Sequence, residues 1–361
     1  MVAAASTLPL SPQRPPFDTI VSSSPLFTHP KTPLRPYIEY LHIFAMDRCP
    51  PEILLKIFAL ACTDGGTTGC VLSLVSRYIR EVSSIVQLQT VAVDRVTRMR
   101  LLLEALRSRP PALRRVKHLF LSDSQAAWRR CWGADSDFGH YDAYAAIMAL
   151  VGQDLITLTV SLRDYVSFYS LAPPGVKFSR LQDLTVECSD FGSPRVQKPA
   201  HSNLIPGSFP NLRRLNCYGM ASRGSDQSHL PLLNTVADAA PALAYLRLSG
   251  VHELVHLPNI LSVGLRIDDE EPGRGVAAHR LPTDIQRIIV QPARIAYYGE
   301  CDYGANDHCE MLEGLENLTM VDEHVCLASE GSYRHEDCLK DWLDVIGGGD
   351  GCWLLPDTRS H

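Results

Sequence analysis

The amino-acid sequence predicts an α/β protein in which an N-terminal all-α part of three helices precedes an irregular array, with one strand plus a helix or loop per repeat. Three observations lead to this fold class. Apolar residues recur at helical spacing between residues 51 and 108. Beyond Pro111, a short pattern of leucine-like residues returns every 17 to 39 residues. The composition, with 45% hydrophobic and 20% charged residues, is typical of globular proteins.

The first 46 residues contain eight prolines among many serines and threonines. Proline lacks the backbone N–H and restricts the residue before it, so a disordered arm is expected over residues 1–46. No basic residue precedes the short apolar run at the N-terminus, unlike a secretory signal. No stretch approaches the roughly 18 apolar residues of a membrane span. We therefore expect an intracellular protein, cytoplasmic or nuclear, without membrane partners.

Three amphipathic segments follow the arm. The first starts at Pro50-Pro51-Glu52, where proline and an acidic residue suit a first helical turn, and it ends at the turn residues 63–68. The second is predicted over residues 70–84, and the third runs from Val96 to Ser108, before Pro110-Pro111. The apolar stripe of the first helix contains Ile53, Leu54, Ile57, Phe58 and Ala61.

The repeated pattern places apolar residues at relative positions one, four and six. It occurs at residues 116–121, 155–160, 181–186, 212–217 and 243–248, and more weakly at 260–265, 285–290 and 315–320. Such a repeat predicts a leucine-rich-repeat solenoid, in which neighbouring units bury each other's apolar sides. Positions four and six share one face of a strand, since side chains alternate.

Residues on either side of position six should therefore face away from the core. Aromatic residues and arginine are enriched at binding hot spots. The candidate target-binding residues chosen on this basis are Phe120, Tyr218, Arg247 and Arg266.

These patterns divide the chain into four predicted parts. Residues 1–46 form the arm, 47–92 the N-terminal helical domain, 93–346 the repeat array and 347–361 a flexible glycine-containing tail.

The helical domain resembles an F-box. Residues 50–58 read Pro-Pro-Glu-Ile-Leu-Leu-Lys-Ile-Phe and residues 74–77 read Leu-Val-Ser-Arg, close to the family's Leu-Pro-x-Glu-Ile-Leu-x-x-Ile-Phe and Leu-Val-Cys-Arg. Two positions depart from the family pattern: Cys49 replaces the usual leucine, and Ile79 stands where tryptophan is common. Resemblance to F-box proteins with a C-terminal leucine-rich array covers most of the chain.

The resemblance implies a substrate-recognition subunit of a cullin-type (SCF) ubiquitin ligase. Its F-box-like part would dock on the Skp-type adaptor of the cullin scaffold, and the array would hold an unknown target protein. Such a subunit has no catalytic residues and needs no cofactor. The implied adaptor-binding residues are Pro50, Pro51, Ile53, Leu54, Ile57, Phe58, Val75 and Ile79.

Two alternatives remain open. The chain could be an interaction scaffold outside any ligase, with the helical domain packed on its own array. It could also bind zinc, because seven Cys and His residues fall within 38 residues, although their spacing differs from compact zinc motifs. These residues are Cys301, His308, Cys309, His324, Cys326, His335 and Cys338. A formal charge of −6 and a pI near 6.1 argue against a general nucleic-acid binder.

Overall fold

The chain divides into two compact units, Met1–Cys49 and Pro50–His361, and the fold described below belongs to the second. The computed structural model describes residues 49–123, 139–162, 171–188, 206–220, 236–252, 254–267, 281–294 and 303–354. The predicted arm lies outside this described part.

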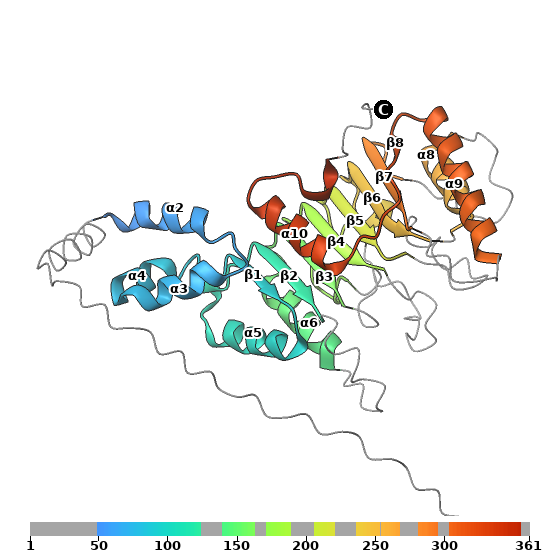
Figure 1. Cartoon of the computed structure of the whole chain (residues 1–361). Helices are drawn as coiled ribbons and strands as arrows, with labels where there is room; N and C mark the ends of the chain where they lie inside the picture. The colour runs from blue at the N-terminus through green and yellow to red at the C-terminus, as the bar shows by residue number, and fades with distance from the viewer. Residues whose placement is uncertain are drawn as a thin grey trace, which may run out of the picture. The chain divides into compact units, whose positions relative to one another are not determined.

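Within the described residues, eight parallel strands form one sheet in which the strand order equals the order along the chain (Figure 1). Equivalent residues of neighbouring strands lie in register: Leu158 pairs with Leu119 on one side and with Leu184 on the other. The strands are β1 (Thr90–Val93), β2 (His118–Ser122), β3 (Thr157–Ser161), β4 (Asp183–Glu187), β5 (Arg214–Tyr218), β6 (Tyr245–Val251), β7 (Arg287–Pro292) and β8 (Val325–Leu327).

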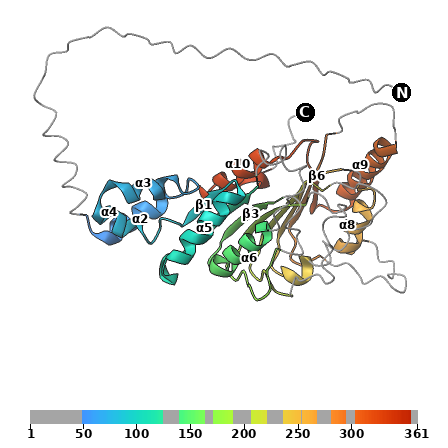
Figure 2. The same ribbon diagram turned by 90° about the horizontal axis from the view of Figure 1, so that it is seen from below.

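One face of the sheet packs on helices that lie between strands in the sequence (Figures 1 and 2). They are α5 (Val96–Ser108), α6 (Gly139–Val151), α8 (Leu257–Leu265) and α9 (Tyr303–Val321). Neighbouring parallel strands require such crossover connections, because a tight turn can join only antiparallel strands. The bounds of α5 confirm the helix predicted at 96–108.

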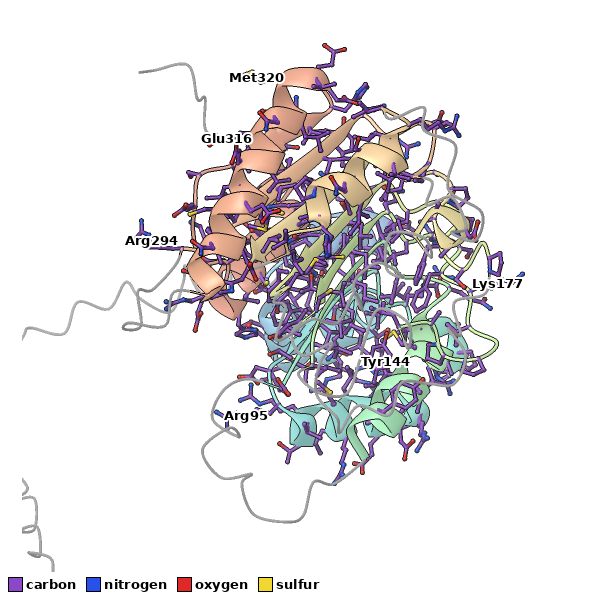
Figure 3. The ribbon with its side chains drawn as sticks, turned by 90° about the vertical axis from the view of Figure 1, so that its right-hand side faces the viewer. Arg95, Tyr144, Lys177, Arg294, Glu316 and Met320 are labelled. Carbon is purple, nitrogen blue, oxygen red and sulfur yellow. The ribbon has the colours of Figure 1, made fainter. Side chains whose placement is uncertain are left out.

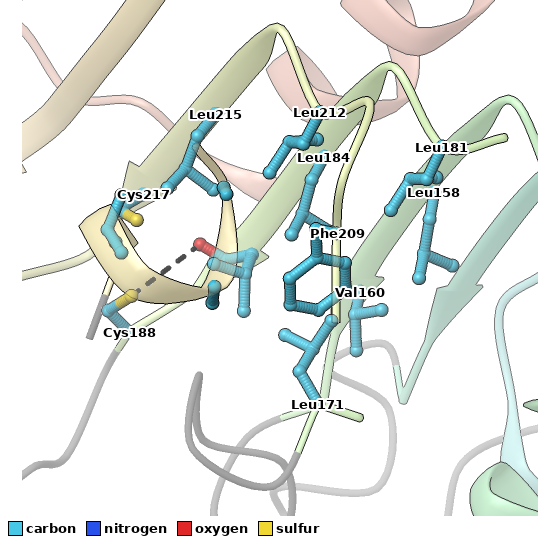
Figure 4. Close-up of a cluster of buried hydrophobic side chains, with 14 of the residues drawn as sticks. Leu158, Val160, Leu171, Leu181, Leu184, Cys188, Phe209, Leu212, Leu215 and Cys217 are labelled. Atoms are coloured by element: carbon cyan, nitrogen blue, oxygen red, sulfur yellow. Dashed lines mark hydrogen bonds between the residues drawn. The ribbon is translucent and has the colours of Figure 1, made fainter. Parts of the chain in front are cut away.

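The main hydrophobic core lies between these helices and the sheet. Figure 4 shows how Leu184 and Leu215 of adjacent strands project to the same side, toward Phe209. The Phe178 and Phe209 rings stack within this core, with their centroids 5.2 Å apart. Tyr144 of α6 is fully buried and donates a hydrogen bond to the Leu171 carbonyl at 2.7 Å, whereas Met320 lies on the exterior of α9 (Figure 3).

The opposite face of the sheet is covered in part by the C-terminal segment. Helix α10 (His335–Ile346) contacts β2 and β3, and the short 3-10 helix η3 (Gly351–Trp353) follows it. Trp342 and Cys338 of α10 join Phe120 and Tyr218 of the sheet in a second, smaller apolar cluster. The main core therefore lies on one face of the sheet, and a smaller apolar cluster lies on the other.

The N-terminal helices are α2 (Pro51–Ala61), α3 (Thr67–Val75) and α4 (Arg77–Ser83). The predicted single helix over 70–84 is wrong, because the backbone is extended at Ser76 and its hydroxyl caps α4 by accepting from the Ile79 N–H at 3.1 Å.

The predicted fold class is also wrong. The described residues form an all-parallel eight-stranded sheet with interleaved helices, and no separate three-helix F-box module precedes it. Residues 90–92, assigned from the sequence to the helical domain, belong to the first strand of the sheet, and the third predicted helix lies between β1 and β2. Backbone pairing therefore continues across the predicted domain boundary and joins both parts into one unit.

Two of the predicted repeats are helices. Residues 260–265 lie in α8 and residues 315–320 lie in α9. A spacing of three residues between apolar positions also suits one turn of a helix, so the short pattern does not discriminate between the two structures. The irregular leucine-rich array predicted from these repeats is replaced by a parallel sheet whose strands are separated by segments of unequal length.

His118 at the start of β2 makes the stability of this fold depend on pH. Burial, and to a lesser extent the Lys117 charge, lowers its pKa from 6.5 to about 4, and its Nδ1 lies 3.1 Å from the Thr157 hydroxyl. As the pH falls, His118 is therefore protonated first in the unfolded chain. The stability that the neutral, buried His118 contributes is complete above pH 6.5 and is lost as the pH falls toward 4. The loss should reach about 3 kcal/mol.

Urea unfolding of the wild type and of His118→Gln between pH 7.5 and 4 measures this contribution. We expect the free energy of unfolding to fall less steeply with decreasing pH in the variant. Equal pH dependence in the two proteins would contradict the assignment to His118.

Candidate protein-binding site

Two N-terminal helices expose apolar side chains. Pro50 and Pro51 begin α2, and Glu52 lies in its first turn, where a negative charge complements the helix dipole. The Asp64 carboxylate then accepts from the Thr68 N–H in the first turn of α3 at 2.9 Å. Both α2 and α3 pack on α4. The exposed apolar residues of α2 and α3, here called the α2–α3 surface, are Ile53 (46%), Ile57 (49%), Leu60 (80%), Val71 (56%), Leu74 (77%) and Val75 (59%).

The inner sides of these helices are held by the chain itself. Leu54, Phe58 and Ile79 are buried. The Gln89 side chain donates to the Ala59 carbonyl at 2.9 Å, and the Thr90 hydroxyl donates to the Cys62 carbonyl at 2.7 Å. Gln89 and Thr90 lie at the start of β1, and their acceptors lie at the C-terminal end of α2. This end of the helix is therefore anchored to the sheet.

The predicted adaptor-binding residues therefore separate into two groups. Five of them are exposed and three are buried inside the helical part. The exposed residues are Pro50, Pro51, Ile53, Ile57 and Val75, and the buried residues are Leu54, Phe58 and Ile79. Leu60, Val71 and Leu74 extend the exposed group. Helical spacing identifies them, because Leu60 follows Ile57 by three residues, Val71 precedes Val75 by four, and Leu74 follows Val71 by three.

Three of the predicted target-binding residues lie beneath the C-terminal segment. Phe120, Tyr218 and Arg247 have exposed fractions of 1%, 3% and 7%. The Phe120 ring is 5.6 Å from the Trp342 ring and 5.4 Å from the His335 ring. Their role in target binding stays a prediction, and in this arrangement it requires that α10 move away.

Arg266, the fourth predicted residue, lies elsewhere. It is the C-cap of α8, is exposed, and has a positive φ of 62°. The structure does not bring it into the group formed by the other three, because its segment is a helix on the face of the sheet opposite α10.

Arg247 is the centre of a polar network between β6 and the C-terminal segment. Its guanidinium donates to the Ser249 hydroxyl at 2.9 Å, to the Gln291 side-chain carbonyl at 2.9 Å and to the Cys352 carbonyl. It also lies 5.9 Å from the centre of the Tyr333 ring. A planar guanidinium suits this arrangement, since it presents several donors in fixed directions.

A second polar group lies near the carboxyl ends of β2 to β5. The hydroxyls of Ser161 and Tyr218 both donate to the Glu187 carboxylate, at 2.6 and 3.2 Å. The Ser122 hydroxyl lies 3.2 Å from Nδ1 of His335. The Ser122–His335 contact joins α10 to β2, whereas the Glu187 carboxylate links β3, β4 and β5 to one another.

The two cysteines of the C-terminal segment are protonated at neutral pH. Burial raises the pKa of Cys352 to about 11 and also raises the pKa of the Cys338 thiol. A thiolate is the nucleophilic and metal-binding form of cysteine, so neither residue has the character of a reactive thiol in this arrangement.

The Cys and His residues considered for zinc are distributed over both sides of the sheet. His308 and Cys309 belong to α9, whereas His335 and Cys338 belong to α10. Among the described residues, no three Cys, His, Asp or Glu side chains are grouped as metal ligands. Cys301 lies outside the described part of the chain.

None of the predicted target-binding residues belongs to α10. Cys338, Trp342 and Ile346 recur every four residues, a spacing that predicts one face of a helix and could have identified α10.

Comparison with models of protein families, with curated proteins and with solved structures finds no match to this chain. In the portion of the chain that the structure describes, no helix has the length and apolar character needed to span a bilayer.

Proposed function

We propose that this chain is a substrate-recognition subunit of a cullin-type ubiquitin ligase, and that the α2–α3 surface docks on the Skp-type adaptor. The observation that carries the proposal is the exposure of six apolar side chains on two short helices whose inner sides are anchored within the chain. Burial of apolar area is the main favourable term in protein association, and exposed apolar patches mark interaction sites.

The sequence motif supports the choice of partner. The segment that resembles the F-box opening, residues 50–58, contributes Pro50, Pro51, Ile53 and Ile57 to the exposed side of α2. Helix packing against a partner helix would cover these residues at spacings of three and four. A subunit with this role acts inside the cell, in the cytoplasm or nucleus, and holds its target while other subunits carry out the transfer of ubiquitin.

Substitution of Ile57 by Asp tests the adaptor contact. Because Ile57 is 49% exposed, its replacement should change the free energy of unfolding little, whereas a charge desolvated in the docked interface costs several kcal/mol. We expect the full-length variant to lose co-precipitation with the Skp-type adaptor and the cullin. Lys56→Asp is the matched control, since Lys56 is an exposed neighbour outside the apolar stripe, and it should retain binding.

Retention of adaptor binding by Ile57→Asp would contradict the proposal. If wild-type protein captures no adaptor but Ile57→Asp removes another bound protein, the α2–α3 surface belongs to an interaction scaffold outside the ligase.

A further inference from the structure

The two faces of the sheet differ in chemical character. Leu119, Leu158 and Leu215 represent the apolar face that packs on α5, α6, α8 and α9. The other face carries buried polar residues on neighbouring strands, including Ser122, Thr159, Ser161, Glu187, Asn216 and Arg247. A sheet face that only serves as a core is apolar, because buried polar groups cost free energy unless they are hydrogen-bonded. The polar face is therefore suited to recognition as well as to packing.

The segment that covers the polar face contributes limited apolar contact. Helix α10 buries Cys338, Trp342 and Ile346. The Trp342 indole N–H is buried and has no hydrogen-bond partner among the described residues. A small solvent-open pocket lies between this segment and strands β3 and β4, lined by Trp342, Trp353, Thr159 and Asp183 among others. The C-terminal segment therefore packs imperfectly on the sheet around Trp342, its main aromatic contact.

Charge complementarity indicates what the polar face holds. Helix α10 carries Glu336, Asp337, Asp341 and Asp344 against one basic residue, Lys340. Asp341 interacts electrostatically with Arg247, and Asp350 does so with Arg214, whose guanidinium also pairs with Asp183 of the same sheet face. The occupant is an acidic amphipathic helix with an aromatic anchor.

This occupant can leave without breaking the sheet. It contributes no strand, and residues 332–334, which connect it to the rest of the chain, have no regular secondary structure. Ser332 and Arg334 in this connection are exposed, whereas Tyr333 between them packs edge-on against Tyr218. Segments with few buried apolar contacts open at lower free energy than the strands of a core.

We propose that the polar face beneath α10 is a binding site for an acidic amphipathic helix of a partner protein, and that residues 335–353 occupy this site until the partner helix displaces them. The inference deepens the proposed function by naming the class of target, and it rests on that function only for what happens to the bound partner. Occupancy by the chain's own segment lowers the apparent affinity for a partner by the fraction of time that the site is open.

A fluorescent synthetic peptide of residues 333–354 is the probe. It is titrated into the full-length wild type and into full-length Trp342→Ala, in which the chain's own segment loses its anchor. We expect the variant to bind the peptide at least tenfold more tightly than the wild type. Leu343→Ala is the matched control, because Leu343 is the neighbouring residue at 37% exposure, and it should bind like the wild type. A peptide with Asp337, Asp341 and Asp344 replaced by asparagine should bind about tenfold more weakly.

Hydrogen exchange of the wild type gives a readout that does not depend on the folding of a variant. We expect the amides of α10 to exchange before those of β3 to β6. Exchange of α10 only together with these strands, or equal peptide affinity of the wild type and a folded Trp342→Ala, would overturn the proposal. Neither the peptide titration nor hydrogen exchange involves the adaptor. The two proposals can therefore fail separately: Ile57→Asp should lose adaptor binding and still bind the peptide.

Discussion

Replacement of Leu215 by alanine is expected to lower the free energy of unfolding by about 3–5 kcal/mol. Leu215 is fully buried in β5, with β4 and β6 on either side, and its side chain belongs to the main core. The substitution removes apolar contact and leaves a cavity that neighbouring strands cannot close without breaking their backbone pairing. Urea unfolding followed by circular dichroism measures the change.

Leu74→Ala is the matched control for this prediction. The same atoms are removed, but Leu74 is 77% exposed on α3, so the free energy of unfolding should change by no more than about 0.5 kcal/mol. In adaptor binding the order should be reversed. Leu74→Ala should weaken binding, because only this variant removes a residue of the α2–α3 surface. Similar stability of both variants would show that the core is not positioned as described.

Replacement of Arg247 by methionine is expected to destabilise the protein by about 2–3 kcal/mol and to loosen the C-terminal segment. Methionine keeps an extended apolar side chain but leaves the Gln291 side-chain carbonyl and the Cys352 carbonyl without their donor. These acceptors are partly buried, so the loss of their donor costs part of the free energy of desolvation. Urea unfolding measures the first effect, and hydrogen exchange of α10 measures the second.

Arg247→Lys tests whether the planar donor group matters. A lysine ammonium retains the charge but cannot replace three directed N–H donors, so its stability should lie between those of the wild type and Arg247→Met. A lysine variant that matches the wild type would assign the effect to charge alone. Unchanged exchange of α10 in Arg247→Met would mean that the network does not hold the segment.

Local patterns predicted several elements of this protein well. The helix at 96–108 has the expected bounds, since its apolar residues recur at helical spacing and Pro110-Pro111 ends it. The segments at 116–121, 155–160, 181–186, 212–217, 243–248 and 285–290 each contain residues of a strand from β2 to β7. The same pattern at 260–265 and 315–320 lies in helices, because an apolar spacing of three residues is shared by both structures.

The candidate site was predicted less completely. The motif at residues 50–58 located a helix with an exposed apolar side, but it did not separate Ile53 and Ile57, which face outward, from Leu54 and Phe58, which face inward. That distinction depends on where α4 packs. On the polar face, Phe120 and Tyr218 were selected as accessible residues, whereas α10 buries both of them.

The sequence by itself determined where apolar and polar residues alternate, where helices begin and end near proline, and which segments carry the apolar pattern shared by strands and helices. These properties depend on neighbours within a few residues, which exert their influence in any conformation. Only the tertiary structure decided that β1 joins the sheet and that α10 returns across the polar face to bring Ser122 and His335 together, although 213 residues separate them. Such contacts are set by the free energy of the whole packed unit, because the faces that cover one another come from distant parts of the chain.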